Sequence, residues 1–456
     1  MASKSDDHAS RYSVDLLVLG SGMAGMTAAA QAAQSGLSVL VVEKARATGG
    51  SAGISRGYVW TTPSLEALQE EDPHVDPDLV RVLADEFLPS VEWVKEELGV
   101  EVSDRITGIY HFGHGFLLDI WTYLDACRAA LERAGGQVLT GLSTRELTLD
   151  GGRVTGAELA DAGGATVVVE ARETVLATGG FQGSPELRAE HVAPQARDML
   201  LRANPDSVGD GLRLALAAGA EFVDGRGGFY GHLVPAPLTD FEEPDYIATA
   251  MLHSGHCLLF DAAGERFTDE SLGDHDNCQQ VLRTSTGRAL LVADDHVRRE
   301  HLEQAYIPGM DHYDKFALAR EKRAHVFTGA STLDELVAGV AGWGYDPAGV
   351  KRSIEAYDRG VREAPDALSP PSSRHPRPLD EAPFFAMEVQ PAITFTYGGI
   401  RADATSRVLG ADGPVEGLLT AGADMGGVYT RAYAGGLSRG LVFGRRAALT
   451  AAGQER

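Results

Sequence analysis

Residues 14–44, VDLLVLGSGMAGMTAAAQAAQSGLSVLVVEK, contain the pattern that decides the fold. Residues 16–19 form a short apolar run whose length suits a buried parallel strand. Three glycines follow with the spacing G-x-G-x-x-G, and an alanine-rich helix is predicted to continue to Gln34. Gly36 ends that helix, and residues 38–42 predict a second strand. The order of strand, glycine turn, helix and strand predicts a dinucleotide-binding βαβ unit.

The three glycines and the acid that follows them have separate roles in such a unit. Gly20 permits the tight turn, Gly22 lets the backbone approach a pyrophosphate, and Gly25 lets the helix pack closely on the strand. The helix N-terminus offers unpaired N–H groups and a positive dipole end to the phosphates. Glu43 ends the second strand, where a carboxylate can accept both ribose hydroxyls of an adenosine. The chain has 54 glycines, so the motif alone could arise by chance, but the agreement of all these features favours binding over a purely structural loop.

Length and composition limit the classes of function. The 456 residues suffice for two or three domains, and 44% hydrophobic with 23% charged residues is normal for a soluble globular protein. A net charge of −25 argues against a nucleic-acid partner or an anionic membrane surface. No apolar run approaches the roughly 20 residues of a membrane span. A small-molecule substrate is therefore expected.

The N-terminal residues and the cysteines indicate the compartment. Residues 1–13 are polar and lack the apolar core of a signal peptide, which predicts a short disordered tail. Cys127, Cys257 and Cys278 are odd in number and have no C-x-x-C spacing. They are predicted to be reduced, buried thiols of a cytoplasmic protein rather than disulfides or metal ligands.

The rest of the chain predicts an interrupted first domain. Residues 14–225 hold the βαβ unit, a glycine-rich stretch from Gly49 to Gly57, helices within 64–98 and 120–134, and a β-rich region. In that region, strands are predicted at 138–149, 154–159, 166–169 and 175–178. The glycine-rich stretch can lie flat against a large planar ligand, although a flexible linker is the alternative.

A change of character near residue 226 predicts a second domain. Residues 226–385 hold most of the histidines and no further βαβ pattern, and they end in a proline-rich connector at 369–385. We interpret 226–385 as an inserted capping, or substrate, domain. Residues 386–456 then return to the first domain, with a buried strand at 418–421 and a final helix.

Three motifs at predicted strand ends, GSGMAG, ATGGF and AGAD, favour FAD over NAD. An NAD dehydrogenase would not need a second strand end with a glycine and an acid about 380 residues after Glu43. The ribityl chain and isoalloxazine ring of FAD extend to such a second set of loops. These motifs, with GERFTDE, PLDEAPFFAMEVQPAITFTYGGIRADATSRVL and YAGG…VFGRRA, resemble the fumarate reductase/succinate dehydrogenase group of FAD flavoproteins. Within it, the 3-ketosteroid dehydrogenase and tricarballylate dehydrogenase branches are the most similar.

This resemblance implies an α/β fold in which a Rossmann-type FAD-binding domain is interrupted by an α+β capping domain, with substrate held between the two at the flavin. The cofactor contacts that the motifs and the resemblance imply come from the strand ends, the glycine-rich stretch and the start of the last helix. They are Gly20, Gly22, Met23, Ala24, Gly25, Glu43, Lys44, Gly49, Gly50, Ser51, Ala52, Ser55, Gly57, Ala177, Thr178, Gly179, Asp210, Gly422, Asp424, Leu437 and Ser438.

Departures from the fumarate reductase pattern bear on the substrate. Phe395 stands where that group has a histidine, Asp274 or His275 where it has a proton-delivering arginine, and Tyr433 where it has a substrate-binding arginine. A fumarate-like dicarboxylate is therefore disfavoured. The histidine of covalently flavinylated members is absent from EKARATGGSAG, so FAD is expected to be non-covalent.

Tyr433 matches the tyrosine of 3-ketosteroid dehydrogenases that polarises the substrate ketone together with a nearby backbone N–H. Its alternative role is that of a packed aromatic residue. For proton transfer His232 is the first candidate, because GFYGHLVP lies where relatives place substrate-contacting residues. A lone histidine is more often structural, and further candidates remain open. These are Tyr230, His253, His256 and Tyr110.

The expected function is that of an FAD-dependent oxidoreductase acting on a CH–CH or C=C bond next to a carbonyl, with hydride exchanged at flavin N5. The expected substrate is a ketone of the 3-ketosteroid dehydrogenase type. An alternative is reduction of an unsaturated carboxylic acid through arginines at unexpected positions, such as Arg431 or Arg439. A flavin-binding redox sensor without turnover is a third hypothesis. The sequence predicts no metal site and does not identify the electron acceptor or donor.

Overall fold

The computed structural model describes residues 10–307, 310–374 and 376–454, which belong to two compact units. Unit 1 combines Met1–Val192, Ala203–Gly228 and Phe395–Arg456, and unit 2 combines Ala193–Arg202 with Phe229–Thr394. Unit 2 extends beyond the expected segment 226–385 because β16 (Phe384–Thr396) is one continuous strand. Ala193–Arg202 joins unit 2 because its strand β10 (Leu200–Leu201) pairs with β16.

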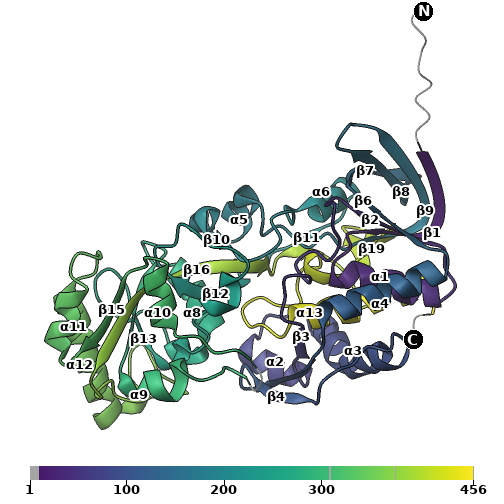
Figure 1. Ribbon diagram of the computed structural model, residues 1–456. Coiled ribbons are helices and arrows are strands. Elements are labelled where there is room, and N and C mark those ends of the chain that lie inside the picture. Colours follow the sequence, from purple (N-terminus) through teal and green to yellow (C-terminus); the bar gives the residue numbers. More distant parts are fainter. Residues whose placement is uncertain (1–9, 308–309, 375, 455–456) are drawn as a thin grey trace, which may run out of the picture. The chain divides into compact units, whose positions relative to one another are not determined.

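Unit 1 is built on a sheet with the strand order β18-β19-β9-β1-β2-β6 (Figure 1). Strand β1 lies between β2 and β9 and pairs in parallel with both. On their other sides, β2 pairs in parallel with β6, and β9 pairs in parallel with β19. The carboxyl ends of these parallel strands therefore meet at one edge, where open α/β sheets bind their ligands. The strands are β1 (Ser10–Leu19), β2 (Val39–Glu43), β6 (Gln137–Thr140), β9 (Thr166–Leu176), β18 (Arg407–Gly410) and β19 (Gly413–Thr420).

The first helix of unit 1, α1 (Met23–Gln34), is buried along nearly its whole length and packs against α4 (Ile120–Arg133) and α13 (Gly436–Ala451). Small residues make the contact with α13 close. A Cβ on Gly444 would lie 2.6 Å from the carbonyl oxygen of Ala24. Because α13 ends the chain and α1 follows β1, this contact holds the two ends of the unit together.

Three expectations about the strands differ from the structure. The predicted strand 138–149 is two strands, β6 and β7 (Leu142–Asp150), separated at Gly141, whose φ of +76° suits only glycine. The predicted strands 166–169 and 175–178 form one strand, β9, which pairs with β8 (Arg153–Asp161) on one side and β1 on the other. Strand β1 begins at Ser10, six positions before the apolar run 16–19 from which it was predicted. Residues 10–13 of the expected tail therefore pair with β9, and residues 1–9 lie outside the described residues.

Unit 1 also has a three-stranded antiparallel sheet that carries aromatic residues of the candidate site. Its order is β3-β5-β4, with β3 (Tyr58–Thr61), β5 (Gly113–Leu117) and β4 (Ile106–Ile109). A further pair joins β11 (Phe222–Val223) to β17 (Gly399–Ile400). Further helices of this unit are α2 (Leu65–Glu71), α3 (Pro77–Glu96), α5 (Pro185–His191) and α6 (Asp210–Ala217).

Unit 2 has a mainly antiparallel sheet around β16, in which only the short β10 pairs in parallel among the described strands, and this makes it an α+β domain. Strand β16 pairs antiparallel with β14 (Ala289–Ala293) and β15 (Val326–Ala330), and β14 pairs with β13 (Leu258–Phe260). Strand β12 (Phe229–Pro235) also pairs with β16. Its helices include α7 (Asp245–Ala248), α8 (Asp274–Leu282), α9 (Asp295–Val297), α10 (Lys315–Glu321), α11 (Leu333–Gly339) and α12 (Pro347–Glu363).

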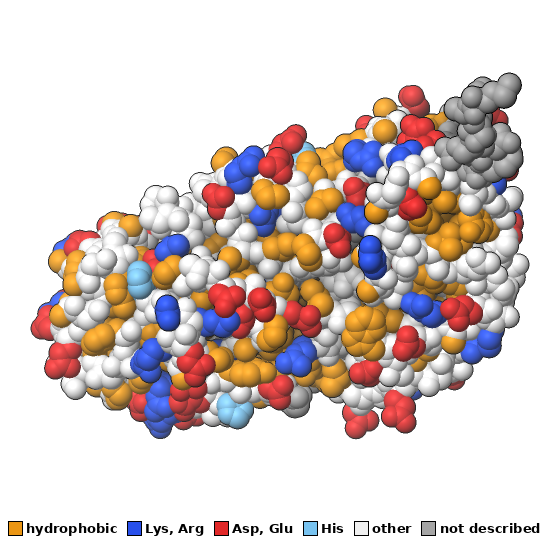
Figure 2. All heavy atoms as spheres, turned by 45° about the horizontal axis from the view of Figure 1, so that its top comes forward, with side chains coloured by type: hydrophobic (Ala, Val, Ile, Leu, Met, Phe, Trp, Pro, Cys, Tyr) orange, Lys and Arg blue, Asp and Glu red, His pale blue; other side chains and the backbone are white. Residues whose placement is uncertain are grey.

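The described residues contain no helix long and apolar enough to cross a membrane. Cys127, Cys257 and Cys278 are buried free thiols, as expected. Acidic and basic side chains are interspersed over the face shown in Figure 2, on a chain with a net charge of −25. The cytoplasmic location stays a prediction from the sequence.

Candidate active site

The glycine turn after β1 has the close contacts that the motif predicts. A Cβ on Gly20 would lie 2.2 Å from the carbonyl oxygen of Ala177, and one on Gly25 would lie 2.0 Å from that of Gly20. A Cβ on Gly22 would meet nothing nearer than 3.8 Å, so the chain leaves space beside this residue. Gly22 is the N-cap of α1, which has neither a side-chain cap nor an acid in its first turn. The positive end of α1 is thus suited to a phosphate group.

Glu43 lies at the carboxyl end of β2, directly beside this turn. Its carboxylate is buried and accepts hydrogen bonds from the Ser21 N–H at 3.0 Å, the Ser21 hydroxyl at 2.7 Å and the Ala45 N–H at 2.9 Å. A carboxylate has about four lone-pair sites, so it can take a further donor such as a ribose hydroxyl. Lys44, the next residue, forms an ion pair of 2.7 Å with Asp210 at the start of α6.

Asp424 has a different environment from the one expected of a cofactor contact. Its buried carboxylate accepts hydrogen bonds from the N–H groups of Thr178, Gly179 and Gly180 and from the Thr178 hydroxyl. These four donors occupy the usual acceptor sites of a carboxylate. Asp424 therefore ties the AGAD loop to the ATGG loop, and its contact with a cofactor stays a prediction.

The glycine-rich stretch after Glu43 lies flat against a planar group of the chain itself. Cβ atoms on Gly49 and Gly53 would lie 3.0 and 2.7 Å from ring carbons of Trp121, whose side chain is 49% exposed. A Cβ on Gly57 would lie 2.0 Å from the carbonyl oxygen of Leu118. Backbone packing thus requires glycine at Gly57, whereas at Gly49 and Gly53 the nearest atoms belong to the Trp121 side chain.

These features fit the ADP half of FAD: an uncapped helix N-terminus for the pyrophosphate, open space at Gly22 and a buried carboxylate at the strand tip. The other expected contacts gather on the same elements of unit 1. Met23 and Ala24 begin α1. Ser51 accepts from Asn204 N–H, and Ser55 from Gly57 N–H. Gly50, Ala52, Ala177 and Gly422 lie in the surrounding loops, and Leu437 and Ser438 begin α13.

Tyr433 lies in a group of aromatic rings that the sequence did not predict as a group. It contacts Trp60 edge to face at a centroid distance of 5.2 Å, Phe395 at 5.8 Å and Tyr429 at 5.9 Å. Tyr110 lies 6.0 Å from it and is stacked on Trp60. Phe395 and Tyr433, for which the resemblance to fumarate reductases implied a histidine and an arginine, are therefore in ring contact.

The loop before Tyr433 is held by Asp72, a residue that sequence reasoning missed. The fully buried carboxylate of Asp72 accepts hydrogen bonds from the N–H groups of Thr430, Arg431 and Ala432 and from the Thr430 hydroxyl. Nothing in the local sequence EEDPH distinguishes Asp72 from the neighbouring surface acids, because its partners lie more than 350 residues away. Asp72 therefore holds the backbone of the loop that leads to Tyr433.

Arg439 on α13 is buried beside this group, with 1% of its side chain exposed. Its guanidinium lies over the rings of Phe395 and Tyr429, 5.7 Å from each centroid. Its three guanidinium nitrogens have no hydrogen-bond partner among the described residues. Burial lowers the pKa of Arg439 to about 10. A buried cation without an acceptor indicates a place for an anionic or strongly polar group of a bound molecule. Arg431, by contrast, is exposed.

Unit 2 contains a relay of three side chains around His232. Its Nε2 is 2.8 Å from the Tyr230 hydroxyl, and its Nδ1 contacts the carboxylate of Asp274. Asp274 also accepts a hydrogen bond of 3.1 Å from the Leu233 N–H. Strand β12 carries Tyr230 and His232, and α8 begins with Asp274. The structure thus brings one of the two residues expected at the arginine position of fumarate reductases onto the predicted histidine.

Burial dominates the electrostatics of this relay. It lowers the pKa of His232 well below its usual value and raises the pKa of Asp274 to about 7. Burial also lowers the pKa of Lys315, which donates to the carbonyl oxygens of Ile247 and Ala248, to about 8. Groups that exchange protons near neutral pH are suited to acid–base chemistry.

Two further candidates for proton transfer, His253 and His256, lie elsewhere in unit 2, beside His301. His275, the alternative to Asp274, is buried on α8. Tyr110 belongs to the aromatic group around Tyr433 and has the left-handed φ of +47°.

Comparisons with known proteins identify the family and the fold of the chain. Residues 121–438 match a family model described as FAD binding domain, and residues 15–180 match one described as FAD dependent oxidoreductase. The chain is 27% identical to a fumarate reductase (cytochrome) of Shewanella frigidimarina, over 96% of this chain and 77% of that protein. It is also 27% identical to 4-oxocyclohexanecarboxylate 2-dehydrogenase of Sinomonas cyclohexanicum, over 98% of this chain and 94% of that protein.

The fold is similar to that of 3-ketosteroid-Δ4-(5α)-dehydrogenase from Rhodococcus jostii, with a TM-score of 0.75 and 21% identity over 99% of both chains. The fold is also similar to that of an open flavocytochrome c3 fumarate reductase, with a TM-score of 0.67 and 23% identity over 97% of this chain and 78% of that one. These similarities confirm the expected fold, a Rossmann-type FAD-binding domain interrupted by a capping domain.

Proposed function

This chain belongs to the FAD binding domain family and is an FAD-dependent oxidoreductase of the CH–CH class, and from that premise we propose that it desaturates a small cyclic ketone next to the carbonyl. The observation that supports a ketone is the ring contact between Phe395 and Tyr433. Where fumarate reductases carry two carboxylate-binding side chains, this chain has an aromatic pair. A phenol donates one hydrogen bond to a neutral carbonyl and cannot pair with a carboxylate as an arginine does.

In this proposal Tyr433 donates to the ketone oxygen and stabilises the negative charge that develops there as the α-carbon loses its proton. Its oxygen accepts a hydrogen bond of 2.9 Å from the Gly436 N–H, which makes the phenol a stronger donor. In the same proposal His232 accepts the proton that leaves the α-carbon, and Asp274 orients its neutral ring. FAD, when bound, supplies the acceptor for the hydride of the β-carbon.

A second candidate is reduction of an unsaturated carboxylic acid, which the buried guanidinium of Arg439 favours. The two candidates share a recognition element if the ketone also carries a carboxylate, as the named substrate of the Sinomonas relative does. Tyr433 would then select the carbonyl end and Arg439 the carboxylate end of one molecule.

Anaerobic stopped-flow absorbance of the flavin tests the proposal. Cyclohexanone and 4-oxocyclohexanecarboxylate are expected to bleach the oxidised holoenzyme, and cyclohexanecarboxylate, which lacks the ketone, is the matched control. If only the dithionite-reduced enzyme responds, through reoxidation by fumarate or acrylate, the second candidate replaces the first. No response to any of these compounds would favour a redox sensor.

We further propose that FAD is bound non-covalently, because EKARATGGSAG lacks the linking histidine of flavinylated relatives. Acid precipitation of the yellow protein should release all of the flavin into the supernatant as FAD. Flavin that stays with the precipitate, or that is released as FMN, would contradict this.

A further inference from the structure

Three histidines of unit 2 that the proposed reaction does not use lie together. His253 and His256 belong to a short helical turn before β13, and His301 comes from the irregular helix η4 (Arg298–Leu302) that follows α9. One ring nitrogen of each lies within 4.8 Å of the others. The rings of His256 and His301 are stacked, with centroids 3.5 Å apart and planes 5° apart. All three are partly exposed, so ions in solution can reach them.

The ring of His253 is oriented like that of a metal ligand. Its Nε2 donates a hydrogen bond of 3.2 Å to the backbone carbonyl oxygen of Gln304, which leaves Nδ1 as the nitrogen with the lone pair. Metal-binding histidines commonly donate their second nitrogen to a carbonyl oxygen in this way. A ligand histidine binds a metal ion through the lone pair of one ring nitrogen, which this hydrogen bond leaves on Nδ1.

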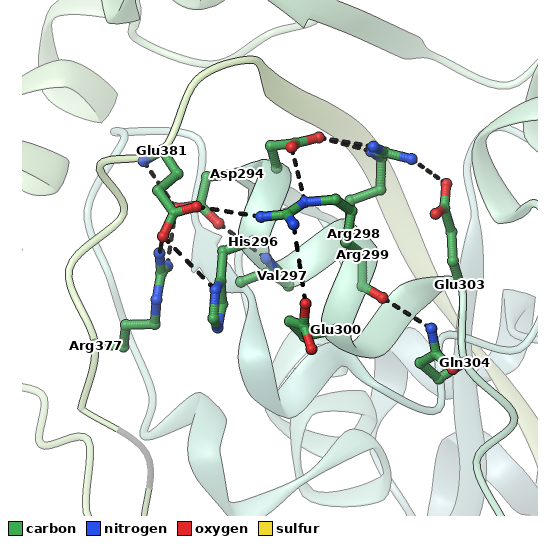
Figure 3. A network of polar contacts seen from close by, with 11 residues as sticks. Asp294, His296, Val297, Arg298, Arg299, Glu300, Glu303, Gln304, Arg377 and Glu381 are labelled. Carbon is green, nitrogen blue, oxygen red and sulfur yellow. Dashed lines mark hydrogen bonds and ion pairs between the residues drawn. The ribbon is translucent and has the colours of Figure 1, made fainter.

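A network of ion pairs holds the segment that supplies His301 and Gln304 (Figure 3). Arg298 pairs with Asp295 and Glu303, on either side of His301 in the sequence. The Gln304 amide donates to the Arg299 carbonyl oxygen at 2.9 Å. Arg377 anchors the start of the segment through Asp294. This network fixes the backbone that carries the ligand and its hydrogen-bond acceptor, so little ordering is left to accompany binding.

A cavity of about 350 Å³ adjoins the cluster. Its lining includes His256 and His301, together with His296, Cys257 and Glu270. Three protein nitrogens beside such a space match zinc sites that have three histidine ligands and keep the fourth position for water or a small ligand. The cavity is large enough for water, and the polar side chains in its lining can hold a water molecule as that fourth group.

We propose that His253, His256 and His301 bind one divalent transition-metal ion, such as Zn²⁺, with the fourth coordination position open to the cavity. Tetrahedral coordination at zinc–nitrogen distances of 2.0–2.1 Å places ligand nitrogens about 3.3 Å apart. The nitrogens, which lie within 4.8 Å of one another, must therefore approach by rotation of the rings, and the stacked pair must open. The alternative is a stack of histidine rings that only packs the two segments together.

Metal titration of the EDTA-treated holoenzyme, with FAD content checked by absorbance, tests the proposal. Calorimetry with Zn²⁺ should give one equivalent per chain, and Co²⁺ should give visible d–d bands of a tetrahedral site outside the flavin absorption. X-ray absorption of the zinc-loaded protein should count three imidazole ligands. This last measurement needs no variant and reports on the site directly. A zinc spectrum without imidazole scattering would overturn the proposal.

The variants His253→Ala, His256→Ala and His301→Gln should each weaken Zn²⁺ binding by at least about 100-fold, the upper effect of outer-shell changes. His312→Ala is the matched control, since His312 is an exposed histidine of the same unit, and it should bind as the parent does. Thermal unfolding confirms that each variant is folded. If the three variants bind Zn²⁺ as tightly as the parent does, or if the parent binds less than one equivalent, the ion is held by surface histidines elsewhere and the proposal is wrong. None of these outcomes depends on ketone turnover, so the metal site and the proposed reaction are tested separately.

Discussion

The phenol oxygen of Tyr433 accepts a hydrogen bond from the backbone N–H of Gly436 at 2.9 Å, so this side chain caps the start of α13. The N-cap residue Gly435 has no side chain for this role, and its φ of +91° favours glycine. Tyr433 therefore combines a structural contact with the position expected of a substrate-polarising donor. Experiments on this residue must separate the two roles.

Replacing Tyr433 by phenylalanine removes only the hydroxyl. If that hydroxyl stabilises the developing enolate, kcat should fall by roughly 10²–10³, with a smaller effect on KM. The lost cap should reduce the free energy of unfolding by only about 1 kcal/mol. Steady-state kinetics with a responding ketone, together with thermal unfolding, measure both effects. Tyr429→Phe is the comparison, because the Tyr429 hydroxyl donates to the carbonyl oxygens of Ala434 and Gly435 and should affect stability without a selective loss of kcat. A near-normal kcat in Tyr433→Phe would leave it a packing residue.

Glu43→Ala should weaken FAD binding by about 1.5–3 kcal/mol, because it removes a charged acceptor from the ribose. Recovery of flavin fluorescence on dilution gives the dissociation constant. Glu43 also accepts from Ser21 and Ala45, so part of the loss can arise from the fold. Unfolding of the apoprotein isolates that part, and Glu43→Gln, which keeps one acceptor oxygen, should be intermediate. Equal FAD retention by the parent and Glu43→Ala would make Glu43 a structural acid.

Arg439→Met should leave the apoprotein as stable as the parent or more stable, because it replaces a buried guanidinium that has no acceptor among the described residues. Arg445→Met on the same helix is the matched control. Arg445 donates to Gln31 and Ser90 and lies over the Trp93 ring, so its loss should lower the melting temperature. If Arg439 meets an anionic group of a ligand, Arg439→Met should weaken binding of a keto acid more than that of the uncharged ketone. Strong destabilisation of the apoprotein by Arg439→Met would show that the Arg439 guanidinium stabilises the protein without a ligand, contrary to this prediction.

The Asp274 carboxyl should make stability depend on pH. Burial raises its pKa from 3.8 to about 7 in the folded protein, so between these values the folded state keeps a proton that the unfolded state releases. The contribution of Asp274 to stability should therefore fall as pH rises from about 4 to 7. Asp274→Asn should flatten this part of the curve of unfolding free energy against pH, measured in urea. An unchanged curve would place the ionisation elsewhere.

Ionised Asp274 holds the His232 proton at Nδ1 and leaves Nε2 to accept from Tyr230. Ketone desaturation by the parent should accordingly increase with pH through about 7, and Asp274→Asn should lose that step.

The sequence by itself determined the elements whose information is local. The G-x-G-x-x-G spacing, the apolar runs and the terminal acid specify the βαβ unit because neighbours in the chain set turn geometry and strand length. The three loops that meet at the carboxyl edge of the sheet could be predicted too, since parallel strands place their ends together. Division of the predicted strand 138–149 at Gly141 was not foreseen, because a positive φ is invisible in an otherwise continuous β pattern.

Only the tertiary structure decided which distant side chains meet. Asp72 binds the backbone of residues 430–432, Trp60 packs on Tyr433, and Asp274 contacts His232 across 42 positions of the chain. No local pattern encodes such pairs, because each depends on how separately specified elements pack. The same packing leaves Arg439 buried without an acceptor and brings His301 onto His256. The fold is thus determined by the spacing of residues along the chain. The chemistry of its sites is determined by contacts between distant residues that form only when the chain has folded.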